Sequence, residues 1–497
     1  MTNWLKSENS ISEAETTRGL HRLLVDGICS QVMGAFTGGA IMVAFALMLG
    51  ASNTVIGIIA SIGPLTQLLQ LPTIFLVKKI QQRKRIVVLT SVVSRIFWVA
   101  IAALPWLAPA NIRVPLLVIF LILYFGFATI SGGAFNSWMR DFIPEKTMGK
   151  YFAKRMAIAT MVGAVATVLG GVALDYGNQL FSSSWAMYSV LFLMGSVFGF
   201  IGVGFLATIP EPTMADRSKQ AMLSTLAEPF RDHNFRKLLT FLGTWNFAIN
   251  LAAPFFTVYM LKRLGLSVSW VLGLSVLSQI FNVLFFRIWG SLADKFSNKS
   301  VLSVSGLLFV ISILVWPFTT MPEKYFLSIP LIIAIHALAG ISTAGVNLCA
   351  GNIALKLAPR GAATSYLAMS ALISGIAATI APIIAGIAAD FFEKQRLSIA
   401  INWFTEGTGS IFAFPAMDAK GLDFVFVAAF LVGLYALHRL LAVWEHGQVD
   451  EEIVMDELYG SVRKAFRNVA NVAGIRHLTY FPYWVLQNVT GPDKSDQ

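Results

Sequence analysis

The stretch NSWMRDFIPEKTMGKYFAKR, residues 136–155, decides the fold, because an imperfect repeat of it begins 215 residues later, at 351. Between 144 and 175 the 215-residue shift gives eight identities in 32 positions without a gap. Apolar bias alone explains matching alanines more readily than the four telling pairs, which are Pro144 with Pro359, Tyr151 with Tyr366, Gly171 with Gly386, and Asp175 with Asp390. The chain is therefore predicted to contain a duplicated unit.

The composition indicates a membrane protein that crosses the bilayer many times. Of the 497 residues, 56% are hydrophobic and only 13% are charged, which is too little charge for the surface of a soluble protein of this size. Apolar runs of about 20 residues, the length needed to cross the hydrocarbon core, recur along the chain. Cys29 and Cys349 both lie in such runs, so we expect no disulfide. Residues 1–22 are polar and predict no signal peptide.

Twelve apolar runs predict an all-α polytopic protein of two pseudo-symmetric six-helix bundles, because backbone polar groups inside a bilayer need internal partners. The first six lie at 23–49, 54–77, 86–107, 114–139, 156–177 and 185–209. The second six lie at 238–261, 268–290, 300–321, 326–350, 365–391 and 421–443. We therefore divide the chain into a cytoplasmic segment (1–22), a first bundle (23–209), a cytoplasmic linker (210–237) and a second bundle (238–445).

The distribution of basic residues predicts that both termini lie in the cytoplasm. Of the 37 lysines and arginines, 28 fall in the segments on the side of the N-terminus, counting Arg439 with the tail. Seven fall in the opposite loops: Arg113, Lys262, Arg263, Lys324, Lys394, Arg396 and Lys420. This asymmetry is the positive-inside pattern of a protein in an inner, cytoplasmic membrane. Topology and the attraction of basic residues to anionic lipids of the bilayer explain the net charge of +11, so no nucleic-acid partner is expected.

Two further segments stand outside the bundles. Residues 392–420 are too polar for a span and are expected to form a long outer loop. The tail, 446–497, is expected to be cytoplasmic and to carry an amphipathic helix that starts near Met455 and stops at Gly474, followed by an aromatic interfacial stretch at 478–486. That helix would dock beneath the bundles or on the lipid surface, with a regulatory role as the alternative.

The loop between the eighth and ninth runs carries a recognisable motif. GSLADKFSNK, from Gly290 to Lys299, resembles the G-x-L-a-D-[RK]-x-x-x-[RK] signature of the major facilitator superfamily (MFS), as do the six-plus-six runs and the central linker. The resemblance implies a transporter whose halves rock about a central cavity, with this loop acting in a cytoplasmic gate. A proline-containing motif typical of the family's antiporters is absent from the fifth run.

The gate implied by the resemblance draws on several loops. Arg287, one turn before Gly290, is a candidate partner for Asp294 in the second half. In the first half, Lys79 is the 215-residue equivalent of Asp294, so this loop lacks the acidic residue of the motif. We therefore interpret KKIQQRKR (78–85) as a signal that sets membrane topology, and we expect Asp141 to supply the missing acid of the gate. The full set of predicted gate residues is Arg140, Asp141, Pro144, Arg287, Gly290, Asp294, Lys295, Lys299 and Pro359.

The resemblance places the first, fourth, seventh and tenth runs around the substrate cavity, and their polar residues are the candidate contacts. Gln31 and Asn246 coincide under the 215-residue shift, so each half offers a side-chain amide at the same depth. These amides are expected either to contact the substrate or, equally, to form hydrogen bonds between helices. The remaining candidates are Trp245 and Asn250, and the weaker ones are Tyr124, Ser131, Asn136, His336, Thr343 and Asn347.

Ionisable residues inside the apolar runs are few. Arg95 is expected to lie about 15 Å into the membrane, at a depth similar to that of Gln67 and Gln70. It is either a structural residue or a residue that attracts an anionic substrate. Asp26 and His336 are the candidates for coupling to a proton. No P-loop, GxSxG or metal-spaced Cys/His set is present, so we expect no cofactor, no metal and no enzyme activity.

The sequence thus favours a secondary transporter that moves a small organic solute, anionic or amphiphilic, by alternating access, as symport or antiport with a proton as the candidate coupling ion. The alternative is a membrane sensor or scaffold that keeps the transporter fold and signals through its C-terminal tail.

Overall fold

The structure is a computed structural model, and it describes residues 11–180, 183–214, 227–320, 324–359, 362–405 and 409–472. Within this part of the chain, eleven helical segments are long and apolar enough to cross a membrane, and a bent helix pair brings the number to twelve. The protein is therefore an all-α polytopic membrane protein, as the hydropathy of the sequence predicted.

The first half consists of α1 to α8. Its helices are α1 (Glu13–Thr37), α2 (Gly39–Met48), α3 (Asn53–Gln67), α4 (Gln70–Ile80), α5 (Arg83–Leu107), α6 (Ala110–Phe142), α7 (Glu145–Leu180) and α8 (Ala186–Ala207). A capping box between Ser12 and Glu15 starts α1. α1 and α2 form one span interrupted at Gly38, because Gly39 adopts a positive φ of 54°. α3 and α4 form the bent pair.

The second half repeats this plan. It consists of α10 (Glu228–Arg231), α11 (His233–Val258), the π-helical turn η2 (Tyr259–Arg263), α12 (Val268–Lys295), α13 (Asn298–Val315), the 3₁₀ turn η3 (Trp316–Thr319), α14 (Ser328–Leu357), α15 (Ala363–Phe392) and α16 (Leu422–Leu441). Pro382 is tolerated inside α15, as prolines are in membrane helices whose neighbours help to satisfy the backbone.

Consecutive spans run in opposite directions, so their connections gather on two faces. One face, here called the N-terminal face, holds the connections at 81–82, 143–144, 208–232, 296–297, 358–362 and 442–450. The other, here called the hairpin face, holds those at 49–52, 108–109, 181–185, 264–267, 320–327 and 393–421. On the hairpin face, residues 392–420, expected to be a loop, instead form an antiparallel hairpin of β1 (Arg396–Thr405) and β2 (Gly409–Lys420).

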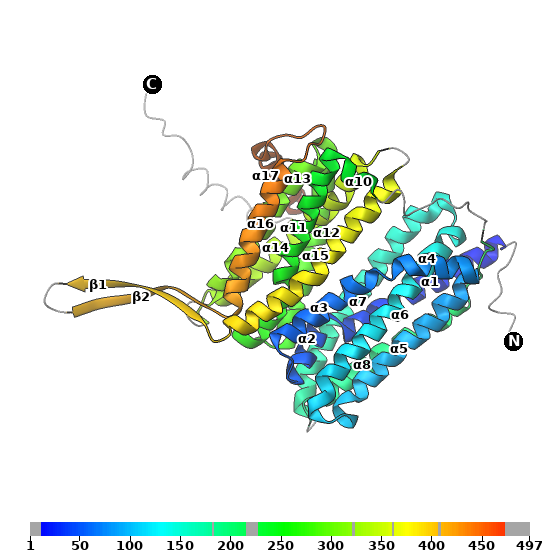
Figure 1. The fold of residues 1–497 in the computed structure, drawn as a ribbon, viewed down its shortest axis with the longest axis horizontal. Helices are drawn as coiled ribbons and strands as arrows, with labels where there is room; N and C mark the ends of the chain where they lie inside the picture. The colour runs from blue at the N-terminus through cyan, green and yellow to red at the C-terminus, as the bar shows by residue number, and fades with distance from the viewer. Residues whose placement is uncertain are drawn as a thin grey trace.

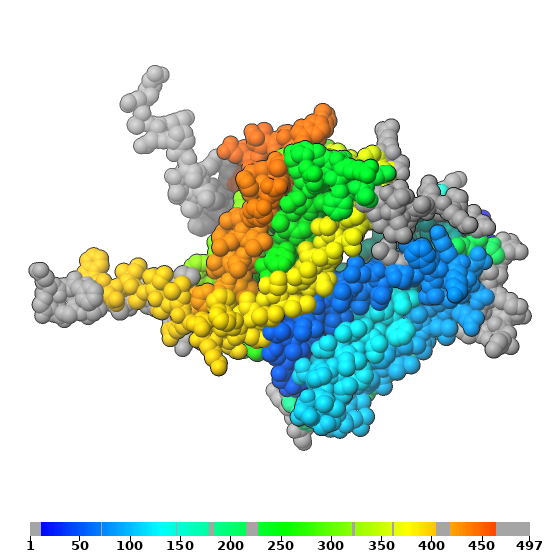
Figure 2. Space-filling model, viewed as in Figure 1, coloured from blue at the N-terminus to red at the C-terminus, as the bar shows by residue number. Residues whose placement is uncertain are grey.

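The two halves lie side by side and diverge towards the N-terminal face (Figure 1). α3 packs along α15, and α7 packs along α12. The space-filling view shows α15 against α3, with the hairpin projecting clear of both bundles (Figure 2). α4, the part of the second span nearest the N-terminal face, packs instead on α5 and α6 of its own half.

The tail begins with α17 (Glu451–Val472), which packs across α12 and α13 on the N-terminal face. It buries Val454 and Leu458 there. The expected amphipathic helix is thus present as far as Val472, and the aromatic stretch at 478–486 lies outside the described residues.

Candidate functional site

Gln31 lines a cavity of about 320 Å³ between α1 and α7. Arg155 of α7 lines the same cavity, with 19% of its side chain exposed. Gly163 of α7 leaves room for α1 to pack closely on α7, since a Cβ there would lie at a tight 3.3 Å from the Cβ of Gln31. The site therefore offers one amide and one guanidinium to a ligand.

Asp26 lies behind Arg155, on the same helix as Gln31. One Asp26 carboxylate oxygen is 3.5 Å from Arg155 Nη2, which is a long contact for a charged pair, and the side chain is only 7% exposed. Arg155 Nε donates a better hydrogen bond, 3.1 Å long, to the backbone carbonyl of Leu23. Arg155 is thus held in place by the backbone and only loosely neutralised by Asp26.

Asn246 of α11 occupies the corresponding level of the second half. Its amide nitrogen donates to Ser374 Oγ of α15 at 3.1 Å and to the carbonyl of Leu242. Under the 215-residue shift Ser374 corresponds to Ala159, which lines the cavity of Gln31. Asn246 therefore joins two helices within its own half, and Asn250 donates in turn to the Asn246 carbonyl.

Three predicted cavity residues are engaged in packing instead. Trp245 is 2% exposed and packs on Phe241 and Phe309 inside the second half, because it points about 100° around the helix from Asn246. His336 is buried against Trp316 and its Nδ1 contacts the carbonyl of Ile332. These positions correct the expectation that Trp245 and His336 face the substrate. Tyr124 packs edge-on against Trp98.

The four other weaker candidates divide into two groups. Asn136 and Asn347 are exposed and form no hydrogen bond with any described residue, so they remain available to a ligand. Ser131 instead pairs with Ser91 of α5, and Thr343 accepts from Asn282 of α12. Ser131 and Thr343 therefore tie neighbouring helices together.

Arg95 lies inside the first half, between α5, α8 and α1. Its Nη1 donates to the carbonyl of Ser91 and to Ser94 Oγ, both within α5. A Cβ on Gly199 of α8 would lie 2.9 Å from Arg95 Cγ, which shows how closely the helices approach. The expected neighbours Gln67 and Gln70 bond to each other instead. Arg95 thus lies away from the residues that line the Gln31 cavity.

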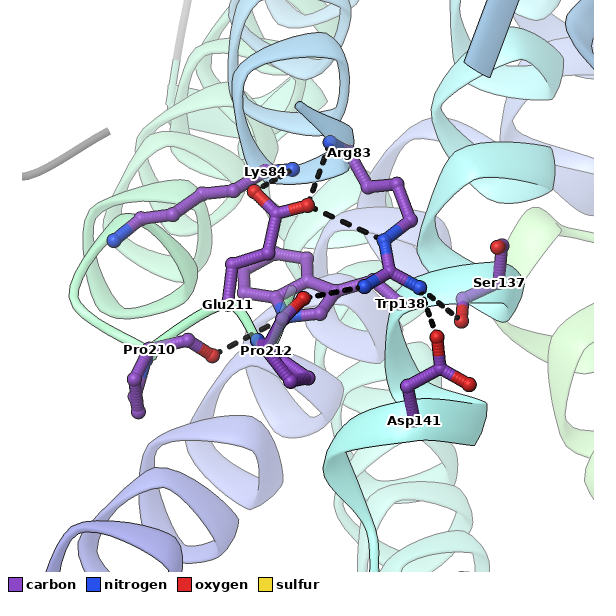
Figure 3. Close-up of polar contacts among 8 residues, drawn as sticks. All are labelled: Arg83, Lys84, Ser137, Trp138, Asp141, Pro210, Glu211 and Pro212. Carbon is purple, nitrogen blue, oxygen red and sulfur yellow. Dashed lines mark hydrogen bonds and ion pairs between the residues drawn. The ribbon is translucent and has the colours of Figure 1, made fainter. Parts of the chain in front are cut away.

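A charged cluster braces the N-terminal face of the first half (Figure 3). Arg83, the first residue of α5, is fully buried; its guanidinium pairs with Asp141 of α6 and, at 3.2 Å, with Glu211, which follows α8. Glu211 also accepts the backbone N–H groups of Arg83 and Lys84. The predicted topology signal at 78–85 therefore includes a residue that ties three segments of one half together.

The second half carries the same cluster with its charges rearranged. Glu445, which follows α16, accepts from the Lys299 backbone N–H at 2.7 Å and from the Asn298 amide at 3.0 Å. Asn298 and Lys299 are the 215-residue equivalents of Arg83 and Lys84. Lys356, the equivalent of Asp141, pairs with Glu445 at 3.0 Å. Each half therefore uses a buried glutamate to cap the start of its third span.

In the part of the chain that the structure describes, no predicted gate residue forms a hydrogen bond or ion pair with the other half. Arg140, Arg287 and Asp294 are exposed and make no hydrogen bond or ion pair with any described residue, so the expected Arg287–Asp294 pair is absent there. Lys295 pairs instead with Glu457 of α17 at 2.8 Å. Pro144 and Pro359 mark the exposed turns before α7 and α15, and Gly290 lies against Leu348 of α14.

Among the described residues, the polar contacts between the halves lie on the hairpin face. Asp390, near the end of α15, accepts hydrogen bonds from the Asn53 N–H (2.9 Å), the Thr54 N–H (2.8 Å) and Thr54 Oγ1 (2.6 Å) at the start of α3. Asp175, near the end of α7, accepts from Ser269 Oγ at the start of α12. In both places an aspartate of one half holds the first turn of a helix of the other half.

These two contacts are copies of each other. Asp175 corresponds to Asp390, and Ser269 to Thr54, under the 215-residue shift. One turn earlier, Gly171 faces the backbone of Ser269, while Gly386 faces the backbone of Asn53 and Thr54. A Cβ at Gly386 would lie 2.5 Å from the Asn53 carbonyl oxygen, so the helices approach this closely only because glycine is present. The sequence repeat displayed the two identities, Asp175 with Asp390 and Gly171 with Gly386, but it did not show that these residues meet the other half.

No metal centre is apparent: in the described ranges no three His, Cys, Asp or Glu side chains group closely enough to hold an ion.

Comparison with known proteins agrees with this architecture. The family model described as "Major Facilitator Superfamily" matches residues 27–382 and 268–421. Among solved structures, a point mutant of the nucleoside transporter NupG has a TM-score of 0.60 at 13% identity, over 87% of this chain and 100% of that one. A bacterial homologue of the human lysosomal transporter Spinster, inward-facing and unoccupied, has a TM-score of 0.60 at 14% identity, over 88% and 100%.

The D-xylose-proton symporter has a TM-score of 0.56 at 14% identity, over 88% of this chain and 98% of that one. None of the curated proteins matches the chain. At these identities the structural likenesses establish the fold, while the family model covers both halves. The chain is a multi-pass integral membrane protein that belongs to the Major Facilitator Superfamily.

Proposed function

We propose that this protein is a secondary transporter for a small organic anion, with Gln31 and Arg155 as its first-half binding residues. The observation that carries the proposal is the shared cavity of these two side chains, in which a guanidinium is held by the Leu23 carbonyl and loosely paired with Asp26. A carboxylate or phosphate would bind that guanidinium better than a 3.5 Å contact with Asp26 does. Arg155 takes over the anion-attracting role that the sequence suggested for Arg95.

Asp26 is the proposed proton site. When Asp26 is ionised it competes with the anion for Arg155, and when it is protonated the competition ends. The other charged or titratable groups near it are Arg155 and Tyr151 of α7, Arg95 of α5 and Cys29 of α1. The proton and the anion would therefore bind together, which gives symport.

The proposed orientation places the N-terminal face and both termini in the cytoplasm, following the positive-inside rule. With the halves joined on the hairpin face, this state would be open to the cytoplasm. Alternating access would then require the contacts of Asp175 and Asp390 to break. The predicted cytoplasmic gate loops around Asp141, Asp294 and Pro359 would approach one another in the opposite state.

Flux into proteoliposomes tests the proposal. Radiolabelled lactate, citrate and glycerol 3-phosphate serve as anions, with uridine and xylose as uncharged comparisons, in an acidic and a near-neutral external buffer. We expect uptake of an anion that is faster in the acidic buffer, falls at least about tenfold in Arg155→Gln and in Gln31→Ala, and loses its pH dependence in Asp26→Asn. Arg231→Gln, which removes an exposed arginine of α10 outside both the cavity and the predicted gate, is the matched control. Equal flux in wild type and Arg155→Gln would contradict the site.

One contact favours the sensor alternative. Glu457 of α17 pairs with Lys295 inside the GSLADKFSNK motif, so the tail touches the segment that the resemblance assigns to the gate. A sensor would transmit cavity binding through this contact without net transport. Ligand-dependent thermal stabilisation of the purified protein without flux in the proteoliposomes would support the sensor over the transporter.

A further inference from the structure

Basic residues of the hairpin face converge on one cavity. A pocket of about 590 Å³ lies where η2, the η3–α14 connection, the end of α15 and the base of the hairpin meet. Five of the seven basic residues that the sequence assigns to this side line it: Lys262, Arg263, Lys324, Arg396 and Lys420. Since lysine and arginine are sparse on this side of the protein, their collection around one cavity requires an explanation other than topology.

The acids of the cavity neutralise only part of this charge. The lining includes two acidic residues, Glu393 and Asp418, against the five basic ones. Asp418 is held by Arg396 through two hydrogen bonds of 2.7 and 2.9 Å, which keep the Asp418 pKa below its usual value, so this pair is ionised and internally balanced at neutral pH. Arg263 lies 3.9 Å from the buried Asp423.

Three lysines therefore supply the remaining positive charge, against the single carboxylate of Glu393. The ammonium groups of Lys262, Lys324 and Lys420 make no hydrogen bond or ion pair with any described residue, and all three side chains are exposed. A concave wall lined with one sign of charge concentrates ions of the opposite sign. Lysine ammonium groups act as point charges towards phosphate oxygens, whereas planar carboxylates are matched better by the arginine fork.

The cavity also borders the contact between the halves. Asn53 lines it, and the Asn53 backbone N–H is one of the donors to Asp390. Asn53 is only 5% exposed, yet its Oδ1 accepts no hydrogen bond from any described residue. A hydroxyl group on a bound molecule would supply the missing donor.

We propose that this cavity is a binding site for a phosphate-bearing organic anion on the hairpin face, held by Lys262, Lys324 and Lys420. Its volume suits a small organic phosphate rather than a bare ion. The same chemistry is available from two sources, a soluble phosphate ester with free hydroxyls and the headgroup of an acidic glycerophospholipid. The site is separate from the Gln31–Arg155 cavity and does not depend on transport.

Binding to the purified full-length protein tests the proposal without any flux measurement. Glycerol 3-phosphate is titrated by calorimetry at low ionic strength, and retained phosphatidylglycerol is counted by native mass spectrometry. The test variant is Lys262→Gln/Lys324→Gln/Lys420→Gln. The matched control, Lys78→Gln/Lys79→Gln/Lys394→Gln, makes the same change in net charge at exposed lysines outside the cavity. The three single variants of the test set are measured alongside.

We expect saturable glycerol 3-phosphate binding that weakens about tenfold or more in the test triple and stays unchanged in the control. Retention of phosphatidylglycerol by the wild type, lost in the test triple, supports the same site with lipid as its occupant. If neither probe binds, or if both triples behave like the wild type, the site does not exist. Arg155→Gln should leave this binding intact, so failure here is distinguishable from failure of the proposed transport site.

Discussion

At the scale of single residues, the duplicated glutamates show how one fold tolerates different charges at equivalent positions. Glu211 and Glu445 each cap the start of a third span, but Glu211 also neutralises Arg83, which is 0% exposed, whereas Glu445 neutralises Lys356, whose side chain is 49% exposed. When one partner of an ion pair is removed, the protein loses little stability if the remaining charge reaches water, but several kcal/mol of unfolding free energy if that charge is buried. The two glutamates should therefore differ in their effect on stability.

Replacing these glutamates separates the two environments. Glu211→Ala leaves buried Arg83 with Asp141 as its remaining acid and should cost about 3–5 kcal/mol of unfolding free energy. Glu445→Ala frees Lys356 to solvent and loses mainly the cap, about 1–3 kcal/mol. Thermal unfolding of the purified protein should therefore show a larger drop in Tm for Glu211→Ala. Glu145→Ala, an exposed acid in the first turn of α7, is the control. An equal drop for both glutamates would contradict the argument from burial.

The same residues show what the sequence could and could not predict. The 215-residue shift identified Asp175 and Asp390, Gly171 and Gly386, because identity is visible in the sequence alone. Their role depends on which helices of the two halves become neighbours, and one sequence carries no record of that. Arg83 was missed because five basic residues in a short loop look alike when only their charge is counted.

At the scale of elements, long spans were predictable and short polar segments were not. Hydropathy located the spans because burial in lipid dominates their composition. The hairpin at 396–420 was missed although Leu397, Ile399, Ile401 and Trp403 alternate with smaller or polar residues, since a single short alternation is weak evidence for a strand. The amphipathic tail helix was predicted correctly in kind because its apolar residues recur at three- and four-residue spacing.

The attachment of α17 should rest on its apolar side chains. Val454 is 0% exposed, whereas Lys295 and Glu457 are about half-exposed, so their ion pair should contribute at most about 1 kcal/mol. Val454→Asp should therefore release α17 and speed tryptic cleavage after Arg463, while Glu457→Gln should leave cleavage nearly unchanged. A transporter should keep its flux in Val454→Asp, and a sensor should lose its signal. Faster cleavage in Glu457→Gln than in Val454→Asp would reverse the assignment.

At the scale of the whole molecule, the two halves contact each other on the hairpin face and diverge towards the N-terminal face. Asp175 and Asp390 hold helix starts of the opposite half, and Gly171 and Gly386 allow those helices to touch. The sequence could predict two halves but not which face is closed, because both states of such a protein use the same helices and bury similar surfaces. The balance between the states should therefore respond to a small change at these contacts.

The double variant Asp175→Asn/Asp390→Asn should shift that balance. Each change keeps the side-chain shape. At Asp175 it turns a charge-assisted hydrogen bond into a neutral one, and at Asp390 the new amide nitrogen can no longer accept from an N–H group of α3, a loss of about 1 kcal/mol each. Together, about 2 kcal/mol should move the ratio of the two states roughly 30-fold towards an open hairpin face. Spin labels at Leu107→Cys and Phe326→Cys report on the hairpin face, and labels at Ile80→Cys and Leu355→Cys report on the N-terminal face, with Cys29 and Cys349 replaced by serine.

If the halves move as rigid bodies, the two distances must change in opposite directions. We expect the double variant to lengthen the hairpin-face distance and to shorten the N-terminal-face distance, each measured by pulsed electron paramagnetic resonance on the protein that carries that pair of labels. Glu393→Gln removes an exposed acid three residues beyond Asp390 and should change neither distance. Lengthening on the hairpin face alone would mean that the contacts of Asp175 and Asp390 clamp only local segments, and that another part of the molecule sets its state.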